Sequence, residues 1–202
     1  AHLSRAATYN PENETMSTYH DGSTFTRNGL QFRARIEHDD STDAPWIEHD
    51  GHGPVTGWTN RSKNPGELIL NSERGAHRYY DMAEAVKTAK RDGWGHGAPI
   101  PGETAGQKAA RAARADFEYL RGWCRNDWHF VMVSVGLIMD GNTVVHSHYI
   151  GGIESTDADT IAGHVGELAD TLATEAADQL RTRAATLAEQ AQRITAAVGA
   201  QA

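Results

Sequence analysis

The sequence predicts an α+β fold: an antiparallel sheet of four to five strands packed with two helices, plus a long C-terminal helix or helical hairpin. Three observations support this prediction. Short segments alternate apolar and polar residues, two stretches between them have helical periodicity, and the C-terminal stretch is rich in alanine. The 202 residues are 39% hydrophobic, which suits one globular domain with appendages. We expect a flexible arm at 1–28, the α+β domain at 29–155 and a helical segment at 156–202.

Five segments are predicted to be strands. In the first, Leu30, Phe32 and Ala34 alternate with polar residues, as in a strand with one buried face. The run at 130–139 is almost continuously apolar, which predicts a central strand covered on both faces. The other segments belong to hairpins whose loops contain glycine. In chain order, the predicted strands are residues 30–36, 67–70, 76–80, 130–139 and 144–150.

Two helices are predicted between the hairpins. Asp81 stands three residues before Glu84, the spacing of an N-cap with its reciprocal carboxylate, so a short helix runs to about Asp92 and ends at Gly93. A second helix spans roughly residues 104–125. Its apolar stripe consists of Ala109, Ala113, Phe117, Leu120 and Cys124.

The alanine-rich residues 157–198 are also predicted to be helical, with apolar residues at heptad-like spacing. One helix of this length would run roughly 60 Å at 1.5 Å per residue, which exceeds the width of a domain of this size. The segment therefore either breaks into a hairpin or packs its distal half on another chain, which predicts a homo-oligomer through residues 157–198. The apolar positions are Ile161, Val165, Leu168, Leu172, Ala173, Ala177, Leu180, Ala184, Leu187, Ala191, Ile194 and Val198.

Charge is distributed unevenly along the chain. The 27 acidic and 19 basic side chains give a formal net charge of -8, which argues against a generally phosphate-seeking protein. Residues 1–60 carry a net charge of -5, residues 61–125 carry +4 and residues 126–202 carry -7. This segregation predicts an acidic face and a basic face, unless the opposite segments simply pack against each other.

Several classes of protein are excluded by what the sequence lacks. It has no apolar run of the roughly 18–20 residues that a membrane span needs, and its first residues lack the apolar core of a secretory signal, so no membrane contact is expected. Cys124 is the only cysteine, so an intramolecular disulfide cannot form. Because it lies on an apolar helix stripe, we interpret it as a small buried hydrophobe. Neither Ser134 nor Ser147 stands in a nucleophile turn, so no catalytic residue is predicted.

The densest cluster of chemically versatile residues lies at 37–52. Between residues 37 and 50 there are six carboxylates and no Lys or Arg, and three imidazoles lie in or beside this stretch. Imidazole and carboxylate are ligands for Zn²⁺ and Mn²⁺, so the loop is a candidate divalent-metal site, although its spacing matches no established motif. The alternative is a polar loop whose side chains bond local backbone. The candidate ligands are His38, His49, His52, Asp39 and Asp50.

Two further groups are candidates for binding. His146 and His148 stand two residues apart in the last strand and hence on one face, where they either share a metal or are satisfied core groups. A basic stripe in the helix at 104–125 is suited to phosphate or to an acidic partner, or forms a solvated helix face. The stripe consists of Lys108, Arg111, Arg114, Arg121 and Arg125.

A resemblance to known proteins lies in residues 32–40, 45–55, 80–86 with 91–95, and 102–110. These stretches, among them PWIEHDGHGPV at 45–55, are similar to a group of proteins encoded in bacteriophage and prophage genomes. The similarity covers about residues 30–155 and leaves both ends of the chain unmatched. It implies a phage origin, with action in the host cytoplasm or association with the virion. It carries over no established activity and no functional residue.

Three functional hypotheses follow. The preferred one is a phage accessory protein that binds a host or phage macromolecule, for example to inhibit a defence or nucleic-acid enzyme, with its carboxylates imitating DNA phosphates. The second is a metal-dependent hydrolase that uses His38, His49 and His52 with neighbouring carboxylates. The third is a nucleic-acid binder that acts through the basic stripe. Binding is thus expected rather than catalysis, and the expected cofactor is either none or a divalent Zn or Mn ion.

Overall fold

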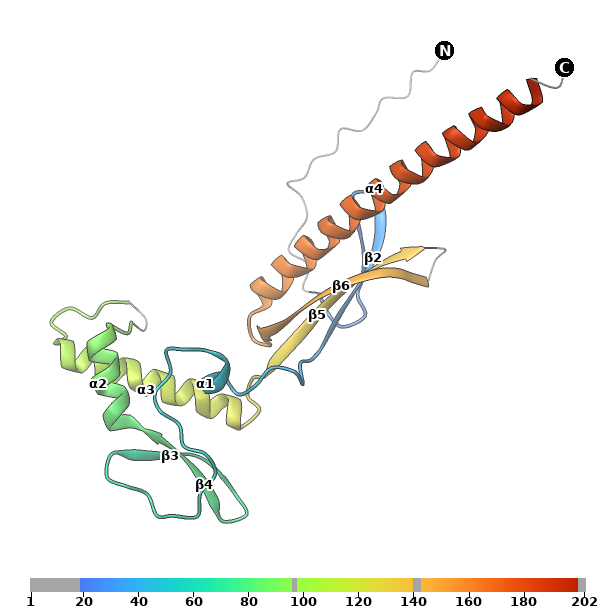
Figure 1. Cartoon of the computed structure of the whole chain (residues 1–202). Helices are drawn as coiled ribbons and strands as arrows, with labels where there is room; N and C mark the ends of the chain where they lie inside the picture. The colour runs from blue at the N-terminus through green and yellow to red at the C-terminus, as the bar shows by residue number, and fades with distance from the viewer. Residues whose placement is uncertain (1–18, 96–97, 140–142, 200–202) are drawn as a thin grey trace. The chain divides into compact units, whose positions relative to one another are not determined.

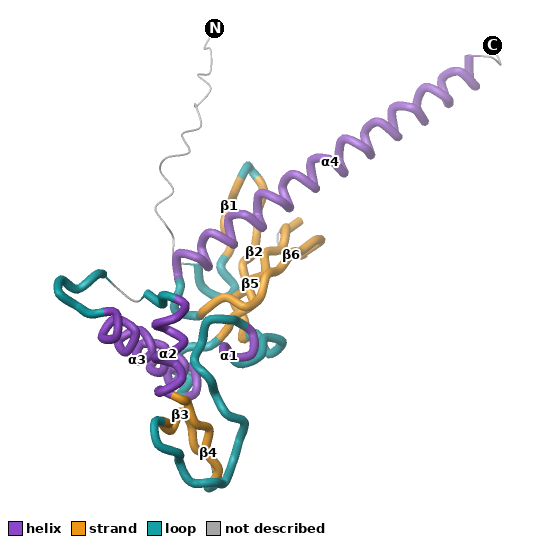
Figure 2. The backbone as a smooth tube through the Cα atoms, turned by 60° about the vertical axis from the view of Figure 1, so that its left-hand side comes forward, coloured by secondary structure: helices purple, strands orange, loops and turns teal. Residues whose placement is uncertain are grey.

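The computed structural model describes residues 19–95, 98–139 and 143–199 (Figure 1). The chain has the predicted α+β fold, with strands and helices in two compact units (Figure 2). The first unit combines residues 1–38 with residues 131–202, and the second comprises residues 39–130. The domain expected at 29–155 is therefore divided between the units. The C-terminal helical segment belongs to the first of them.

The first unit is built on a four-stranded antiparallel sheet in the order β1-β2-β5-β6. The turn between the first two strands places Asn28 and Gly29 at φ values of 51° and 77°, the left-handed pair that an Asn-Gly hairpin turn requires. The second strand then pairs along β5 and ends with His38 opposite Val131. β5 lies between two other strands, which confirms its predicted central position. The strands are β1 (Thr24–Arg27), β2 (Leu30–His38), β5 (Phe130–Met139) and β6 (Thr143–Glu154).

The helix α4 (Ala158–Gly199) is continuous, and its N-terminal half packs across one face of this sheet (Figure 1). Arg27 anchors it by a bidentate ion pair with Asp170, at 2.6 and 2.7 Å. The Arg27 guanidinium fits over Gly166, where an added Cβ would lie 3.0 Å from it. The buried core between sheet and helix consists of Phe32, Ala34, Val131, Val133, Val135, Leu137, Ile153, Ile161, Val165, Ala169 and Leu172.

The opposite face of the sheet surrounds a hollow of about 670 Å³. Ser134 and Gly136 of β5 line it, together with Arg33 and Arg35 of β2. The sequence predicts that β5 is covered on both faces. In the structure α4 covers one face of β5, whereas the other face lines this hollow.

The second unit combines a two-stranded sheet with two main helices. Asp81 accepts a hydrogen bond from the Glu84 backbone N–H at 3.0 Å, and Gly93 at φ 70° ends that helix, as predicted. Thr104 and Gln107 form a reciprocal capping box at the start of the next helix. The elements are α1 (Pro45–Glu48), β3 (Glu67–Glu73), β4 (Ala76–Asp81), α2 (Met82–Asp92) and α3 (Ala105–Cys124). The core residues are Leu70, Tyr80, Ala85, Ala113, Phe117 and Leu120.

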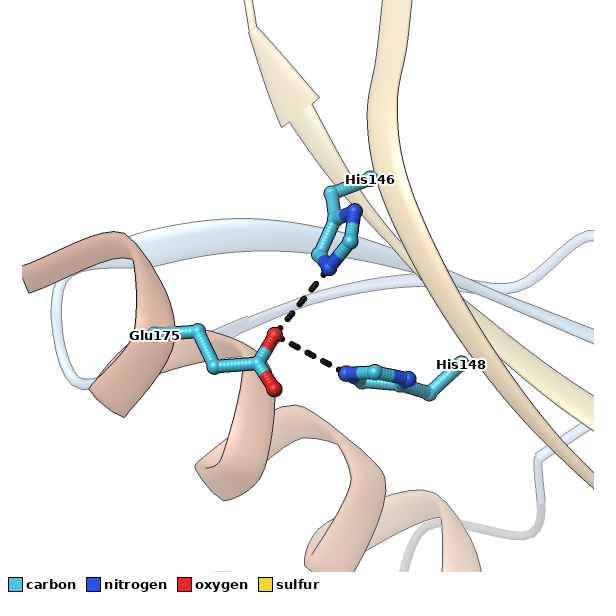
Figure 3. Close-up of side chains that lie close together, drawn as sticks. All are labelled: His146, His148 and Glu175. Atoms are coloured by element: carbon cyan, nitrogen blue, oxygen red, sulfur yellow. Dashed lines mark hydrogen bonds and ion pairs between the residues drawn. The ribbon is translucent and has the colours of Figure 1, made fainter. Parts of the chain in front are cut away.

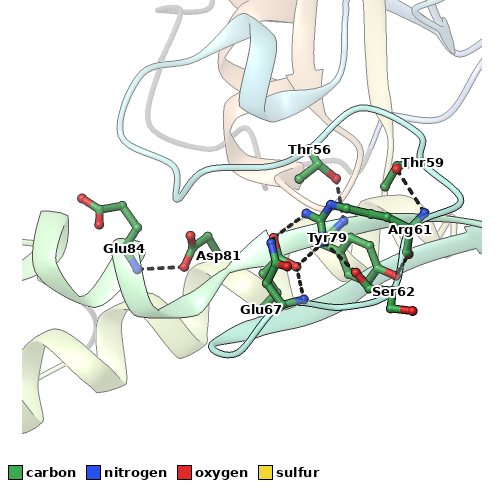
Figure 4. Close-up of polar contacts among 9 residues, drawn as sticks. Thr56, Thr59, Arg61, Ser62, Glu67, Tyr79, Asp81 and Glu84 are labelled. Atoms are coloured by element: carbon green, nitrogen blue, oxygen red, sulfur yellow. Dashed lines mark hydrogen bonds and ion pairs between the residues drawn. The ribbon is translucent and has the colours of Figure 1, made fainter.

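A buried carboxylate, Glu67, fixes the long loop that precedes β3 (Figure 4). Arg61 donates two hydrogen bonds to its oxygens, at 2.6 and 2.7 Å, and the Asn64 backbone N–H donates a third at 2.7 Å. The Tyr79 hydroxyl donates to the carbonyl oxygen of Arg61, whose guanidinium also lies 4.7 Å from the Tyr79 ring centre. The hydrogen bonds from Arg61 lower the pKa of Glu67 to about 2 because they stabilise the ionised carboxylate.

The predicted N-terminal arm and turn are only partly described by the structure. Residues 1–18 of the arm and the turn predicted at 140–142 lie outside the described residues. Residues 24–27, expected to be part of the arm, instead form β1. Among the described helices, none combines the length and the apolar character needed to cross a bilayer.

Candidate metal centre

Two histidines on β6 face the helix α4. Because side chains alternate along a strand, His146 and His148 share one face, whereas Val145 and Tyr149 lie on the other and are exposed. The two imidazole rings pack edge to face, with centroids 5.1 Å apart. Period 2 in the sequence therefore brings two potential metal ligands to the same side of the sheet, as predicted.

The third member of the cluster is Glu175, which comes from α4. It stands three residues after Leu172, which is buried against the sheet, so its side chain lies at the edge of the packed helix face. The ion pair between Arg27 and Asp170 fixes the helix one turn earlier. Packing of the helix on the sheet thus positions the carboxylate opposite the strand histidines.

Both imidazoles point their Nε2 atoms at one carboxylate oxygen (Figure 3). The distance to Glu175 Oε2 is 3.0 Å from His146 and 2.9 Å from His148. One ligand atom from each residue lies within 4.8 Å of the other two, and no other three His, Cys, Asp or Glu side chains meet this condition among the described residues. The side chains are 48%, 34% and 40% exposed for His146, His148 and Glu175, so solvent reaches the cluster.

The cluster favours an ionised carboxylate. The hydrogen bond from His148, assisted by that from His146, lowers the pKa of Glu175 below its ordinary value. An ionised carboxylate and neutral imidazoles are the forms that coordinate a metal ion. Coordination would replace the imidazole protons that now point at Glu175.

The spacing of the donor atoms suits a small divalent ion. Four-coordinate Zn²⁺, with bonds of about 2.0–2.2 Å, holds its ligand atoms about 3.4 Å apart. The observed separations of 2.9 and 3.0 Å therefore need to widen by only a few tenths of an ångström. Three protein ligands leave a fourth position for water, and the exposure of the cluster leaves that position accessible.

The five ligands predicted in the acidic loop are not gathered into one site. His38 ends β2 in the first unit, and the other four lie in the second unit, where no three of them bring donor atoms within 4.8 Å of one another. Asp39 is buried and accepts hydrogen bonds from the backbone and hydroxyl of Ser41 and the hydroxyl of Thr42. These local bonds fit the alternative of a polar loop without a metal ion. His49 is exposed beside Phe130, and Asp50 is exposed.

His52 instead joins a polar network inside the second unit. Its Nδ1 lies 2.6 Å from Asp116, which also accepts hydrogen bonds from the Gly53 backbone N–H and the Tyr80 hydroxyl, both at 2.8 Å. The His52 ring stacks on Tyr119 with centroids 5.6 Å apart. Burial, together with the charge of Asp116, raises the pKa of Tyr80. The network borders a hollow of about 450 Å³ and ties the 51–54 loop to α3.

The predicted basic stripe is largely paired with acidic side chains of its own unit. Arg111 forms a bidentate ion pair with Glu103, with both distances 2.8 Å. Arg114 and Arg121 both contact Glu118, at 3.3 and 3.9 Å. Lys108 and Arg125, the remaining members, are exposed. The geometry thus gives more support to a paired helix face than to a phosphate-binding surface.

Cys124 is less buried than the sequence predicts. Its thiol is only partly buried against the core of the second unit. Burial raises the pKa of the thiol above its ordinary value, which keeps it protonated and weakly nucleophilic.

Sequence reasoning identified the two strand histidines but missed their carboxylate. Glu175 lies 27 residues after His148, in a helix with several acidic side chains, so nothing local distinguishes it. The only feature of the sequence that indicates a position near the sheet is that Glu175 stands beside the apolar helix stripe that includes Leu172. Comparison with protein families, curated proteins and solved structures finds no match for this chain.

Proposed function

We propose that this protein binds a divalent transition-metal ion through His146, His148 and Glu175. The observation that supports the proposal is the convergence of two imidazole Nε2 atoms on one carboxylate oxygen, at 3.0 and 2.9 Å. Two nitrogen donors and one carboxylate favour Zn²⁺ and related ions over Mg²⁺ or Ca²⁺, which prefer oxygen ligands alone. Zn²⁺ is the best probe because it accepts tetrahedral geometry without redox chemistry.

The test is a Zn²⁺ titration by calorimetry on protein without an affinity tag, with metal content measured in parallel. About one ion should bind per chain, and His146→Ala or Glu175→Gln should weaken binding by at least about tenfold. His164→Ala is the matched control, because this helix histidine pairs only with Glu167 among the described residues. Binding that His146→Ala leaves unchanged would overturn the proposal.

The open coordination position extends the proposal to hydrolysis. Zn²⁺ with three protein ligands lowers the pKa of a bound water to about 7 and so generates a hydroxide nucleophile at neutral pH. The exposure of the cluster lets an external ester reach such a water. The Zn²⁺-loaded protein should hydrolyse p-nitrophenyl acetate faster than its Glu175→Gln variant, whereas equal rates would restrict the site to binding.

A second proposal is macromolecular binding, the role preferred from the sequence. Its support is the distal half of α4, in which every residue from Asp178 to Thr195 is exposed. This stretch includes the large apolar side chains Leu180, Leu187 and Ile194. Contiguous exposed apolar surface commonly marks an interaction site. Substituting these residues should reduce capture of a partner, whereas capture that is unaffected would remove this surface from the proposal.

A further inference from the structure

The distal half of α4 lacks the packing that stabilises its proximal half. The helix projects beyond the sheet of its own unit (Figure 1), and all its residues from Asp178 to Thr195 are exposed. In proteins, most helical stability comes from packing an apolar face against another element. This stretch therefore has an apolar face for which the described residues offer no cover.

The apolar face follows a heptad repeat. Leu180, Leu187 and Ile194 recur every seven residues and are 66%, 57% and 65% exposed. Alanines occupy the alternate seam position, three residues before each of them. This is the a/d pattern of a two-stranded coiled coil, with alanine at a and a large residue at d. The alanines are Ala177, Ala184 and Ala191.

We infer that this face binds the same face of a second copy of the chain, with the two helices antiparallel. This inference is independent of the metal centre. It rests on the second proposal above and names the partner of that surface, a second copy of this chain. In a parallel pair in register, alanine would meet alanine and leucine would meet leucine, which leaves alternate layers underfilled. In an antiparallel pair, Leu180 meets the partner's Ala191 and Leu187 meets the partner's Ala184. Each layer then combines one large and one small side chain.

Charge on the flanks of the stripe favours the same orientation. Arg181 and Arg183 are the only charged residues beside the seam between residues 178 and 195, and both lie at one end of it. A parallel pair would bring four guanidinium groups together at that end. The antiparallel pair separates them into two groups at opposite ends, which lowers the repulsion.

A groove at the base of the projecting segment continues the interface. It has a volume of about 420 Å³ and lies where α4 passes the β1–β2 turn. Ala173, Ala177 and Leu180 line it together with Leu30. In the antiparallel register, the partner's Ile194 lies opposite Ala177 and so enters this groove. Ile194 of each helix is thereby buried against the other copy.

The first experiment measures the mass of the full chain by sedimentation over a hundredfold range of concentration. The wild-type chain should pass from monomer to dimer, Leu187→Glu should remain monomeric, and Thr182→Glu on the opposite helix face should behave as wild type. Leu187 is exposed within the chain, so Leu187→Glu should keep the wild-type near-ultraviolet spectrum. A wild-type monomer throughout, or a Leu187→Glu dimer, would overturn the inference.

The second experiment tests orientation by disulfide formation in a Cys124→Ser background. Ala191→Cys alone should not cross-link under mild oxidation, because 11 residues separate it from its antiparallel counterpart, roughly 16 Å at 1.5 Å per residue. A mixture of Ala191→Cys and Leu180→Cys chains should yield the mixed dimer. Efficient cross-linking of Ala191→Cys with itself would instead show a parallel pair.

Discussion

Asp116 receives hydrogen bonds from residues that lie 36 to 64 positions away in the chain. Its carboxylate joins His52, Gly53 and Tyr80, and so connects the 51–54 loop and β4 to α3. Tyr80 is fully buried, so loss of its hydroxyl would leave the partly buried Asp116 carboxylate, whose side chain is 10% exposed, with one donor fewer. The network therefore gives stability to the second unit.

Tyr80→Phe should lower the free energy of unfolding by about 1.5–3 kcal/mol, the usual range for a hydrogen bond to a charged group. Urea denaturation measures this change. Tyr149→Phe is the control, because Tyr149 is 72% exposed and should change stability little. Equal midpoints for Tyr80→Phe and wild type would show that Asp116 does not need this donor.

Glu67 predicts how stability depends on pH. Its pKa is about 2 in the folded chain against 4.5 for an ordinary glutamate side chain, so the folded state binds this proton more weakly than the unfolded state. The stabilisation is complete above about pH 4.5 and is lost as pH falls toward 2. Glu67→Gln should therefore be less stable than wild type at pH 7, and the difference should shrink through that window. Denaturant midpoints at several pH values, with Glu73→Gln as an exposed control, check this expectation.

Single residues also show what sequence reasoning reaches. The caps at Asp81 and Gly93 could be predicted because each depends on neighbours within three or four positions. The partnership of His52 with Asp116 spans 64 positions and depends on the packing of the loop on a helix. No three of the five candidate ligands in the acidic stretch bring donor atoms within 4.8 Å of one another, because proximity along a loop does not by itself place donor atoms together.

At the scale of elements, two connections depend on a glycine. The β1–β2 hairpin needs Gly29 in its turn, and the 51–54 loop needs Gly53 where its backbone lies close to the Tyr80 ring. Gly29 has φ 77° and no atom within 4 Å of an added Cβ, so only backbone strain opposes substitution. Gly53 has no such strain, but its added Cβ would collide with the ring of Tyr80. Both positions require glycine, for different physical reasons.

Gly29→Ala should therefore destabilise the chain by about 1–2 kcal/mol, the penalty of a left-handed alanine. Gly53→Ala should cost more, on the order of 3 kcal/mol, because a fully buried ring must move in a packed core. Thermal unfolding of both variants ranks them, with Gly57→Ala as a control in open space. The reverse ranking would contradict the packing seen around Tyr80.

Most elements could be predicted because each has a local periodicity or cap. β1 was missed although Asn28-Gly29 stands between it and β2, since it has only four residues, of which Phe25 alone is apolar, and lies in a stretch without clear periodicity. The continuity of α4 could not be predicted either. The apolar stripe that starts at Ile161 and the one that ends at Val198 have the same helical spacing. Only the contacts of the first stripe with the sheet distinguish them.

At the scale of the molecule, the charge segregation seen along the sequence largely disappears. The acidic stretch at 39–50 and the basic stretch at 61–125 belong to one unit, which holds 12 basic and 14 acidic side chains. The first unit holds 7 basic and 13 acidic side chains. The alternative in which acidic and basic segments pack in one unit therefore explains more of the charge distribution than an acidic face opposed to a basic face.

Metal binding should act on one unit. Zn²⁺ bound at the proposed centre would join β6 to α4, so hydrogen exchange should slow in both elements when the ion is added. The size of the effect should follow the Zn²⁺ concentration relative to Kd. Peptides from α2 and α3 should exchange as before. His146→Ala should remove the effect, and slower exchange throughout the chain would point to a different site.

The second unit enters and leaves the sheet at neighbouring positions. The Asp39 backbone N–H donates to the Phe130 carbonyl oxygen at 2.9 Å, and His38 stands opposite Val131. β2 and β5 therefore already have the separation that a two-residue turn would span. The 92 residues between them form the second compact unit. We therefore expect that deleting residues 39–130 and joining the strands through Asn-Gly leaves an uninterrupted four-strand meander that binds Zn²⁺ at the proposed centre, as calorimetry would reveal.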